Sequence, residues 1–387
     1  MNVPKLRFPE FNSDWNETTL KNIATINPKN ETLPDKFIYI DLESVNKGIL
    51  SQEKIISKSN APSRAQRIIK KNDILFQTVR PYQQNNYFVE EIKELPYVAS
   101  TGYALIRTNE DSYFVYSLLH KKDFLDKVID RCTGTSFPAI SSNDLGEINI
   151  NIPDIQEQTK ISNFLSLLDK KIELQTKKIE ALKLFKKSQI KEILRKIAGN
   201  IFSLKDLGYF ITGNSIGKDK IIDKGVPVIL YGDLFTKYGE EINTVTKFIK
   251  DNKKYIKSEV GDILFPTSTT VDAISLISPS VINIPNVVYG GDLLIYKCNK
   301  NLVNPNFLSY QINHFKNLEF SKKAQGSTII HIHANDLLNS QVKIPSIKNQ
   351  RVISNFGKSI NRKIELELLK LNKIQQIKKG LLQKMFV

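Results

Sequence analysis

A polar segment follows a short apolar run near residue 75 and carries side chains suited to reading nucleic-acid bases. Arg, Gln and Asn pair in a bidentate way with the edges of base pairs, and several of them stand close together here. Two further arginines lie shortly before the run. We therefore predict a DNA-binding loop with the candidate residues Arg64, Arg67, Gln77, Thr78, Arg80, Tyr82, Gln83, Gln84 and Asn85. For any single residue the alternative is a solvated position in a hydrophilic surface loop.

The second half of the chain carries a matching set of smaller polar residues after the apolar run 263–265. Two Gly-polar loops, near residues 134 and 326, resemble each other in the same way. Hydroxyl groups and loop backbone of this kind contact phosphates or bases. The candidates added by these segments are Thr135, Ser136, Thr267, Ser268, Thr269, Ser327 and Thr328.

Several segments resemble catalytic or nucleotide-binding motifs without meeting their requirements. The run 213–218 reads G-N-S-I-G-K, but a phosphate loop needs four residues between the glycines and Ser or Thr after the lysine. Lys218 is therefore counted only as a candidate DNA contact. Asp154 and Glu157 lie at a predicted helix start instead of a strand edge, and His331 with His333 has no third ligand nearby. We predict no catalytic, cofactor-binding or metal-binding residues in this chain.

The charge of the chain favours an anionic partner. The net charge is +16 with a pI near 9.5, and most of the excess lies in two lysine-rich segments predicted to be helical. A basic surface of this size is typical of nucleic-acid binding, although lysines on the outer faces of long helices can simply be solvated. The two cysteines, Cys132 and Cys298, are too few for a disulfide framework or a zinc site and are expected to be small hydrophobes in a reduced protein.

A stretch of 44 residues occurs twice, at 152–195 and at 344–387, with an offset of 192 positions. The copies align without a gap. They share Ile-Pro at their starts, a glutamine at Gln158 and Gln350, and Lys-Ile-Glu-Leu at 171–174 and 363–366. Twice the offset nearly equals the chain length of 387 residues. The protein therefore consists of two copies of one unit, each a globular part followed by a helix.

Apolar residues in both copies recur at intervals of three, four and seven, which is typical of a coiled-coil seam. Each helix should begin beside a proline, with Asp154 or Ser346 as the N-cap, and the first should end at 199–200. Because the first helix leads into the second globular part, an antiparallel pairing closes the chain best. The predicted seam residues are Ile161, Phe164, Leu168, Ile172, Ile179, Leu182, Ile353, Phe356, Ile360, Ile364, Leu368 and Leu371.

The globular parts show mixed α/β (α+β) patterning in the same order. We expect short helices at 20–26 and 204–210, strands at 37–42, 74–76, 103–106, 226–230 and 263–265, and helical spacing over 113–128. The predicted domains are two similar globular parts, 1–150 and 199–342, and two helical repeats, 151–198 and 343–387, related by a pseudo-twofold axis.

These repeats resemble the specificity subunits of type I restriction-modification systems. The resemblance is carried by Ile-Pro, Gln, Ile, Phe, Asp or Asn, and a lysine-rich coil, and it spans both halves of the chain. The opening Pro4–Phe8 with Trp15 and the stretches 134–145 and 326–337 also match that family.

The resemblance implies two target recognition domains, each reading one half of a split site in double-stranded DNA, with the helices acting as a ruler. It also implies two modification subunits that carry S-adenosylmethionine, and restriction subunits that use ATP and Mg²⁺. This chain itself would hold no cofactor. It is expected in the cytoplasm, since no apolar run approaches the roughly 18 residues needed to span a membrane. The competing interpretations are a coiled-coil adaptor presenting two protein-binding domains, and an enzyme with an unrecognised site.

Overall fold

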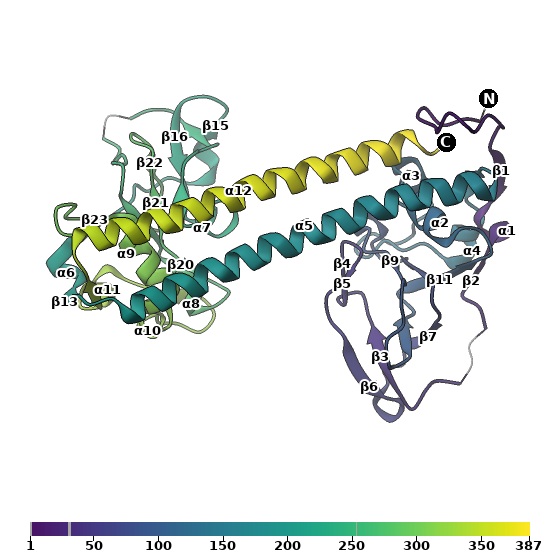
Figure 1. Ribbon diagram of the computed structural model, residues 1–387, viewed down its shortest axis with the longest axis horizontal. Helices are drawn as coiled ribbons and strands as arrows, with labels where there is room; N and C mark the ends of the chain where they lie inside the picture. The colour runs from purple at the N-terminus through teal and green to yellow at the C-terminus, as the bar shows by residue number, and fades with distance from the viewer. Residues whose placement is uncertain (1, 30–31, 253) are drawn as a thin grey trace. The chain divides into compact units, whose positions relative to one another are not determined.

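The computed structural model describes residues 2–29, 32–252 and 254–387 (Figure 1). The chain divides into two compact units. The first contains Met1–Thr176 and Leu369–Val387, and the second contains Lys177–Leu368. Each unit thus combines one globular part with a portion of both long helices. The sequence predicts four consecutive domains, 1–150, 151–198, 199–342 and 343–387. The boundaries of the compact units differ from these, because they fall within the two long helices.

The two repeats form the long helices α5 (Ile155–Lys196) and α12 (Ile347–Lys384), as Figure 1 shows in teal and yellow. Each helix starts immediately after the expected N-cap residue, because the N–H of Gln158 donates to Asp154 and that of Gln350 donates to Ser346. Beyond α5 the chain passes the backbone of Ile344 so closely that a Cβ on Gly199 would lie 2.8 Å from it. Only glycine permits this approach.

The helices run antiparallel within each unit, as predicted. In the first unit Lys378 of α12 contacts Asp169 of α5. In the second, Lys186 Nζ lies 2.7 Å from Asn361 Oδ1, and Lys178 Nζ lies 2.9 Å from Glu367 Oε1. Residue numbers rise along one helix as they fall along the other.

The predicted seam residues differ in how far they are covered. Ile161, Ile179, Ile353 and Ile364 are buried, and Leu168, Ile172, Leu182, Phe356, Ile360 and Leu371 are partly buried. Phe164 and Leu368 are exposed, contrary to the expectation for seam positions. A pair of helices covers only one stripe of each, and Phe164 instead packs edge-on against Phe8 with ring centroids 5.9 Å apart.

The first unit holds two four-stranded sheets. One has the order β6 (Lys54–Ser57), β3 (Lys36–Ile40), β10 (Tyr97–Ser100), β7 (Ala65–Ile69). The other has the order β2 (Ala24–Ile26), β11 (Tyr103–Thr108), β8 (Ile74–Gln77), β9 (Tyr87–Phe88). A further pair, β1 (Asn16–Thr19) with β12 (Asn149–Ile152), leads into α5. The helices of this unit are α1 (Leu20–Ile23), α2 (Ser112–Leu118), α3 (Lys122–Asp130) and α4 (Ser142–Gly146).

The second unit repeats the second of these sheets in the same order. Strands β14 (Gly208–Thr212), β23 (Leu293–Cys298) and β19 (Ile263–Pro266) correspond to β2, β11 and β8, and β21 (Ser280–Ile282) and β17 (Glu241–Ile242) extend the sheet. A four-stranded sheet has the order β15 (Ile221–Ile222), β18 (Phe248–Ile249), β16 (Val226–Ile229), β22 (Val288–Tyr289). The pair β13 (Asn200–Ser203) with β25 (Gln341–Ile344) corresponds to β1 with β12. The shared frame predicted from the sequence is confirmed.

The helices of the second unit are short except for its portions of α5 and α12. They are α6 (Leu204–Leu207), α7 (Tyr231–Thr236), α8 (Ala273–Leu276), α9 (Pro305–Gln311), α10 (Asn317–Ser321) and α11 (Ala334–Leu338). A π-helical segment, Ile312–Lys316, joins α9 to α10.

Three sequence predictions of helices need correction. The helices expected at 20–26 and 204–210 each stop after one turn, and their last residues pair as strands β2 and β14 with β11 and β23. The helical spacing over 113–128 belongs to two helices, α2 and α3, because the chain turns at His120 and Lys121. In each case ladder hydrogen bonds or a turn overrode the local apolar pattern.

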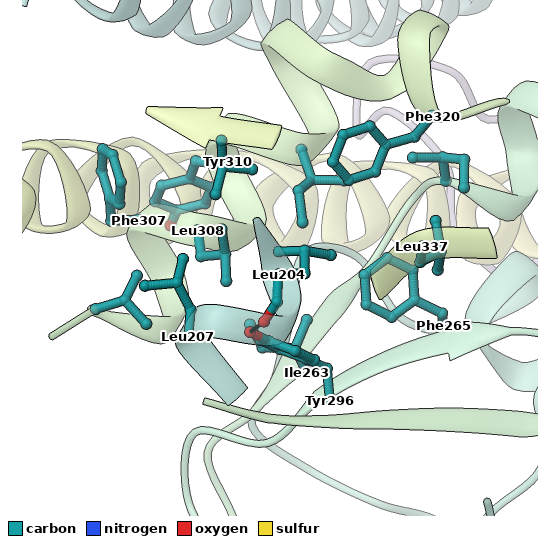
Figure 2. Close-up of a cluster of buried hydrophobic side chains, with 14 of the residues drawn as sticks. Leu204, Leu207, Ile263, Phe265, Tyr296, Phe307, Leu308, Tyr310, Phe320 and Leu337 are labelled. Carbon is teal, nitrogen blue, oxygen red and sulfur yellow. Dashed lines mark hydrogen bonds between the residues drawn. The ribbon is translucent and has the colours of Figure 1, made fainter. Parts of the chain in front are cut away.

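Both long helices contribute to the hydrophobic core of each unit. In the second unit Leu204, Phe265 and Tyr296 gather with Phe307, Leu308 and Phe320 in one apolar cluster (Figure 2), which also contains Ile190, Leu194 and Ile353 of the helices. In the first unit Ile161 and Leu165 join Trp15 and Phe114 with the chain end at Phe386. Cys132 and Cys298 are free and pack beside these cores, as expected of small hydrophobes.

The glutamine shared by both repeats attaches each helix to its domain. Gln158 donates to the carbonyl of Pro153 and accepts from the N–H of Asp111, the N-cap of α2. Gln350 donates to the carbonyl of Pro345 and accepts from the N–H of Asn304, the N-cap of α9. Both amides are buried and satisfied, which explains why the same residue type stands at this position in both copies.

Candidate nucleic-acid interface

Two surface loops, 133–139 and 325–331, are built in the same way in the two units. In the first loop Thr133 and Ala139 exchange two backbone hydrogen bonds of 2.9 Å, and in the second Gln325 and His331 exchange bonds of 2.9 and 2.7 Å. Each loop turns through a glycine in the left-handed region, Gly134 with φ of 91° and Gly326 with φ of 114°. We call these the paired loops.

Each paired loop is fastened to the segment that follows a central strand. The N–H of Ile140 donates to the carbonyl of Thr78 over 3.1 Å, and the N–H of Ile332 donates to the carbonyl of Thr267 over 3.0 Å. In the first unit the N–H of Arg80 also donates to the carbonyl of Pro138. In the second unit β20 (Ser268–Thr269) pairs with β24 (Ile330–His331). The structure therefore brings together the polar segments that the sequence placed far apart.

We call each paired loop, together with the strand-end segment to which it is hydrogen-bonded, a platform. Two of the predicted contact residues support the first platform from inside. Gln77 is buried, and its amide donates to the carbonyl of Val79 over 2.7 Å and to Gln83 Oε1 over 2.8 Å. Thr78 is also buried and donates to the carbonyl of Gly102. Their polar groups form hydrogen bonds within the domain because the segment folds back on itself after β8. They hold the loop in place and do not face solvent.

The rest of the first segment forms a tight polar turn. Asn85 donates its N–H to Gln77 and accepts from the N–H of Lys47, while Arg80 and Gln84 both adopt left-handed backbone conformations with φ near 54° and 53°. Such conformations in non-glycine residues concentrate at functional sites. Tyr82, 54% exposed, and the exposed Gln83 lie between them on the outer side of the turn.

Two arginines carry N–H groups without acceptors among the described residues. The guanidinium of Arg80 lies 4.3 Å from the ring centroid of Phe137, and its Nε is buried without a hydrogen bond. Nε of Arg67, on β7, is in the same condition, and burial lowers the pKa of this guanidinium. Arg64 is exposed in the turn before β7. Arginine side chains of this kind bind phosphates or base edges where their terminal nitrogens reach the surface.

The second platform is smaller and carries hydroxyl groups instead of arginines. Ser327 and Thr328 are exposed in their loop, as Thr135 and Ser136 are in theirs. Thr267 and Ser268 are partly buried, and Thr269 is buried with its hydroxyl accepting from the N–H of Val271. Lys218 is exposed on a separate turn, Lys218–Lys220. The two units thus share a frame but present different side chains.

The segments that resembled catalytic motifs have structural roles. Glu157 is buried in a bidentate ion pair with Arg7, with contacts of 2.8 and 2.7 Å. His331 lies in β24, and His333 starts α11 with its N–H donating to Asp336. Over residues 2–29, 32–252 and 254–387, no group of three or more His, Cys, Asp or Glu residues could hold a metal ion. Across the same ranges no helix is long and apolar enough to cross a membrane.

The sequence prediction missed the apolar tips of the paired loops. Phe137 and Ile329 are 63% and 49% exposed and lie 192 positions apart. They follow the hydroxyl residues directly in each loop. The repeat offset that aligned the helices also aligns these two residues, so the signal was present in the sequence.

Comparison with known proteins shows two matches to one family. Residues 12–184 and 199–378 each match the type I restriction modification DNA specificity domain. The HindI specificity subunit of Haemophilus influenzae is 29% identical over an alignment covering 49% of this chain and 40% of that protein. The MjaVIII specificity subunit of Methanocaldococcus jannaschii is 25% identical over 91% of this chain and 85% of that protein. A crystal structure of a type I system S subunit from M. genitalium has a similar fold, with a TM-score of 0.61, 16% identity and coverage of 100% and 99% of the two chains.

Proposed function

The chain belongs to the type I restriction-modification DNA specificity family, and we propose that it is the non-catalytic subunit that reads a two-part target in double-stranded DNA. The observation that carries this proposal is the pair of loop platforms, equivalent in backbone and different in side chains. A shared frame with divergent polar surfaces suits two readers of two different half-sites. The net charge of +16 favours binding to the phosphate backbone.

We further propose that the helices carry the partner subunits. Apolar side chains remain exposed along α5, among them Leu167, Leu174 and Leu184, and surfaces of this kind mark interaction sites. Two modification subunits, each with S-adenosylmethionine for adenine methylation, would dock there. Restriction subunits that use ATP and Mg²⁺ would join for cleavage. The complex would act on DNA in the cytoplasm.

The test is to co-express the chain with its modification subunits and map methylated adenines on random DNA. A two-part motif with a fixed spacer is expected, and the purified chain alone should transfer no methyl group. A complex that methylates without a two-part motif, or does not bind DNA, would contradict the proposal. A complex that does not bind DNA would favour the alternative, a coiled-coil adaptor that presents two protein-binding domains.

Arg80→Ala tests the first platform directly. Loss of one bidentate base contact typically costs about 1–3 kcal/mol and relaxes specificity at one position. We expect this loss in the first half-site only. The matched control is Arg131→Ala, which removes an exposed arginine at the end of α3 in the same unit. Equal effects of both variants would assign Arg80 to general charge attraction.

A further inference from the structure

The tips of the paired loops expose one large apolar side chain each, at equivalent positions. A single exposed apolar residue needs no explanation, because much of any protein surface is apolar. Here Phe137 and Ile329 occupy the same place in two loops that share a glycine and two hydroxyl residues before the tip. Each follows two small hydroxyl residues, so the tip is apolar and its flank is polar.

The loops hold these tips rigidly. A Cβ at Gly326 would lie 2.1 Å from the carbonyl oxygen of Ile329, and one at Gly134 would lie 3.2 Å from that of Phe137. Both glycines are also left-handed, so the turn depends on them. Reciprocal backbone hydrogen bonds close each loop at its base. A side chain presented in this way loses little freedom when it inserts into a partner.

The neighbours of the tips suit DNA. The guanidinium of Arg80 lies 4.3 Å from the ring centroid of Phe137, and exposed hydroxyls stand beside both tips. Guanidinium and hydroxyl groups bind phosphates, while apolar side chains inserted between base pairs unstack them. The combination matches a kinked or opened duplex more closely than a protein surface.

We propose that Phe137 and Ile329 are wedges that insert between base pairs beside the adenine to be methylated in each half-site. This inference rests on the proposed function. An enzyme acting on a base must take that base out of the stack, and the unstacking costs free energy. A wedge supplied by the recognition chain fills the space that the base leaves. It thereby makes the extruded adenine available to the modification subunit. Phe137 and Ile329 are positioning residues in this scheme.

The experiment uses the complete methyltransferase complex and two kinds of duplex. A duplex with 2-aminopurine in place of one target adenine reports extrusion of the base by its fluorescence. A duplex with both target adenines intact reports the methylation rate, because 2-aminopurine lacks the amino group that is methylated. We expect Phe137→Ala to lower the fluorescence rise and the methylation rate at the first half-site, on the order of tenfold, and to leave the second unchanged. Ile329→Ala should do the reverse, so each variant is the control for the other. Phe137→Leu should retain most of the activity.

Two further arms separate a wedge from a structural role. A mismatch or abasic site opposite the target adenine lowers the cost of extrusion and should restore Phe137→Ala to near wild-type rates. The exposed residues Ile55 on β6 and Leu318 on α10, 58% and 60% exposed, serve as matched controls when changed to Ala and should have no effect. Unchanged fluorescence in both loop variants, or failure of the mismatch to rescue, would overturn the inference. Methylation of both half-sites by the wild-type complex on the duplex with both adenines intact would still uphold the proposed function.

Discussion

Removing the amino group of Lys186 should destabilise the second unit strongly. Its side chain is almost buried where α5 meets the domain, and Nζ lies 2.7 Å from both Glu240 Oε2 and Asn361 Oδ1. The other oxygen of Glu240 lies 2.7 Å from His314 Nε2. Lys186→Met would keep the length of the side chain, remove its ammonium group from Glu240, and leave His314 beside the carboxylate.

The size of the effect follows from the state of Glu240. Burial alone would raise the pKa of this carboxyl, but the contacts with His314 and Lys186 outweigh it and lower the pKa from 4.5 to about 2. At ~1.4 kcal/mol per pKa unit this corresponds to about 3 kcal/mol shared by the two partners. Breaking a buried pair from one side typically costs about 3–5 kcal/mol. Because His314 remains, we expect Lys186→Met to cost about 2–4 kcal/mol.

Urea denaturation at pH 7, followed by circular dichroism, measures this free energy of unfolding. The matched control is Lys187→Met, at the exposed neighbouring lysine of the same helix. Since the pKa of Glu240 is lowered in the folded state, its stabilisation is complete above pH 4.5 and lost as the pH falls toward about 2. The difference between wild type and Lys186→Met should shrink over that range. A Lys186→Met protein as stable as the Lys187→Met control, or a difference that grows in acid, would refute the reasoning.

Four further predictions concern the helices and the domains. Ile179→Ala should lower the free energy of unfolding by about 2–4 kcal/mol, and Ile172→Ala by less because Ile172 is only partly buried, which paired denaturation curves will show. Ile172→Asp should be worse than Ile172→Ala, since it places a charge against apolar neighbours. Exchanging residues 1–150 for the corresponding part of a relative should change one half-site in methylation maps, and a change in both would contradict independent readers. Adding seven residues to both α5 and α12 lengthens each by about 10 Å and should widen the preferred spacer by about 2–3 base pairs, whereas an unchanged spacer would exclude the helices as its ruler.

The long helices and the shared frame could be predicted because they depend on patterns within the chain. The offset of 192 residues located both helices and their N-caps, and the order of apolar runs located β8, β11 and β19. The antiparallel pairing followed from the connection between the copies alone. These features need only periodicity and chain continuity, which a sequence displays directly.

The details of the recognition platforms could not be predicted, because they depend on tertiary hydrogen bonds. The sequence predicts Gln77 to be a surface residue. The turn through Asn85 instead covers it, and the Gln77 amide both donates to the carbonyl of Val79 and accepts from the N–H of Asn85. The residues Ala24–Ile26 read as a helix but complete a sheet with β11, a partner some eighty residues away. Nothing in the local sequence records either partner. Phe137 is a different case, since its equivalence to Ile329 was visible and only its exposure was not.

Two lysine contacts between the helices, one buried and one partly buried, show how the duplicated helices diverged without losing their pairing. Lys186 and Lys378 are 192 positions apart, and so are their partners Asp169 and Asn361. Each contact therefore joins a lysine of one copy to the partner position of the other, as an isologous pairing requires. In the first unit the helix itself supplies the carboxylate, Asp169, which also accepts from Tyr113. In the second the helix position is the neutral Asn361, and Glu240 of the globular part supplies the charge. A buried ammonium group needs a carboxylate, but the carboxylate need not come from the same element. The two repeats thus keep the same pairing geometry. In the second unit, however, the globular part supplies the carboxylate that neutralises the lysine.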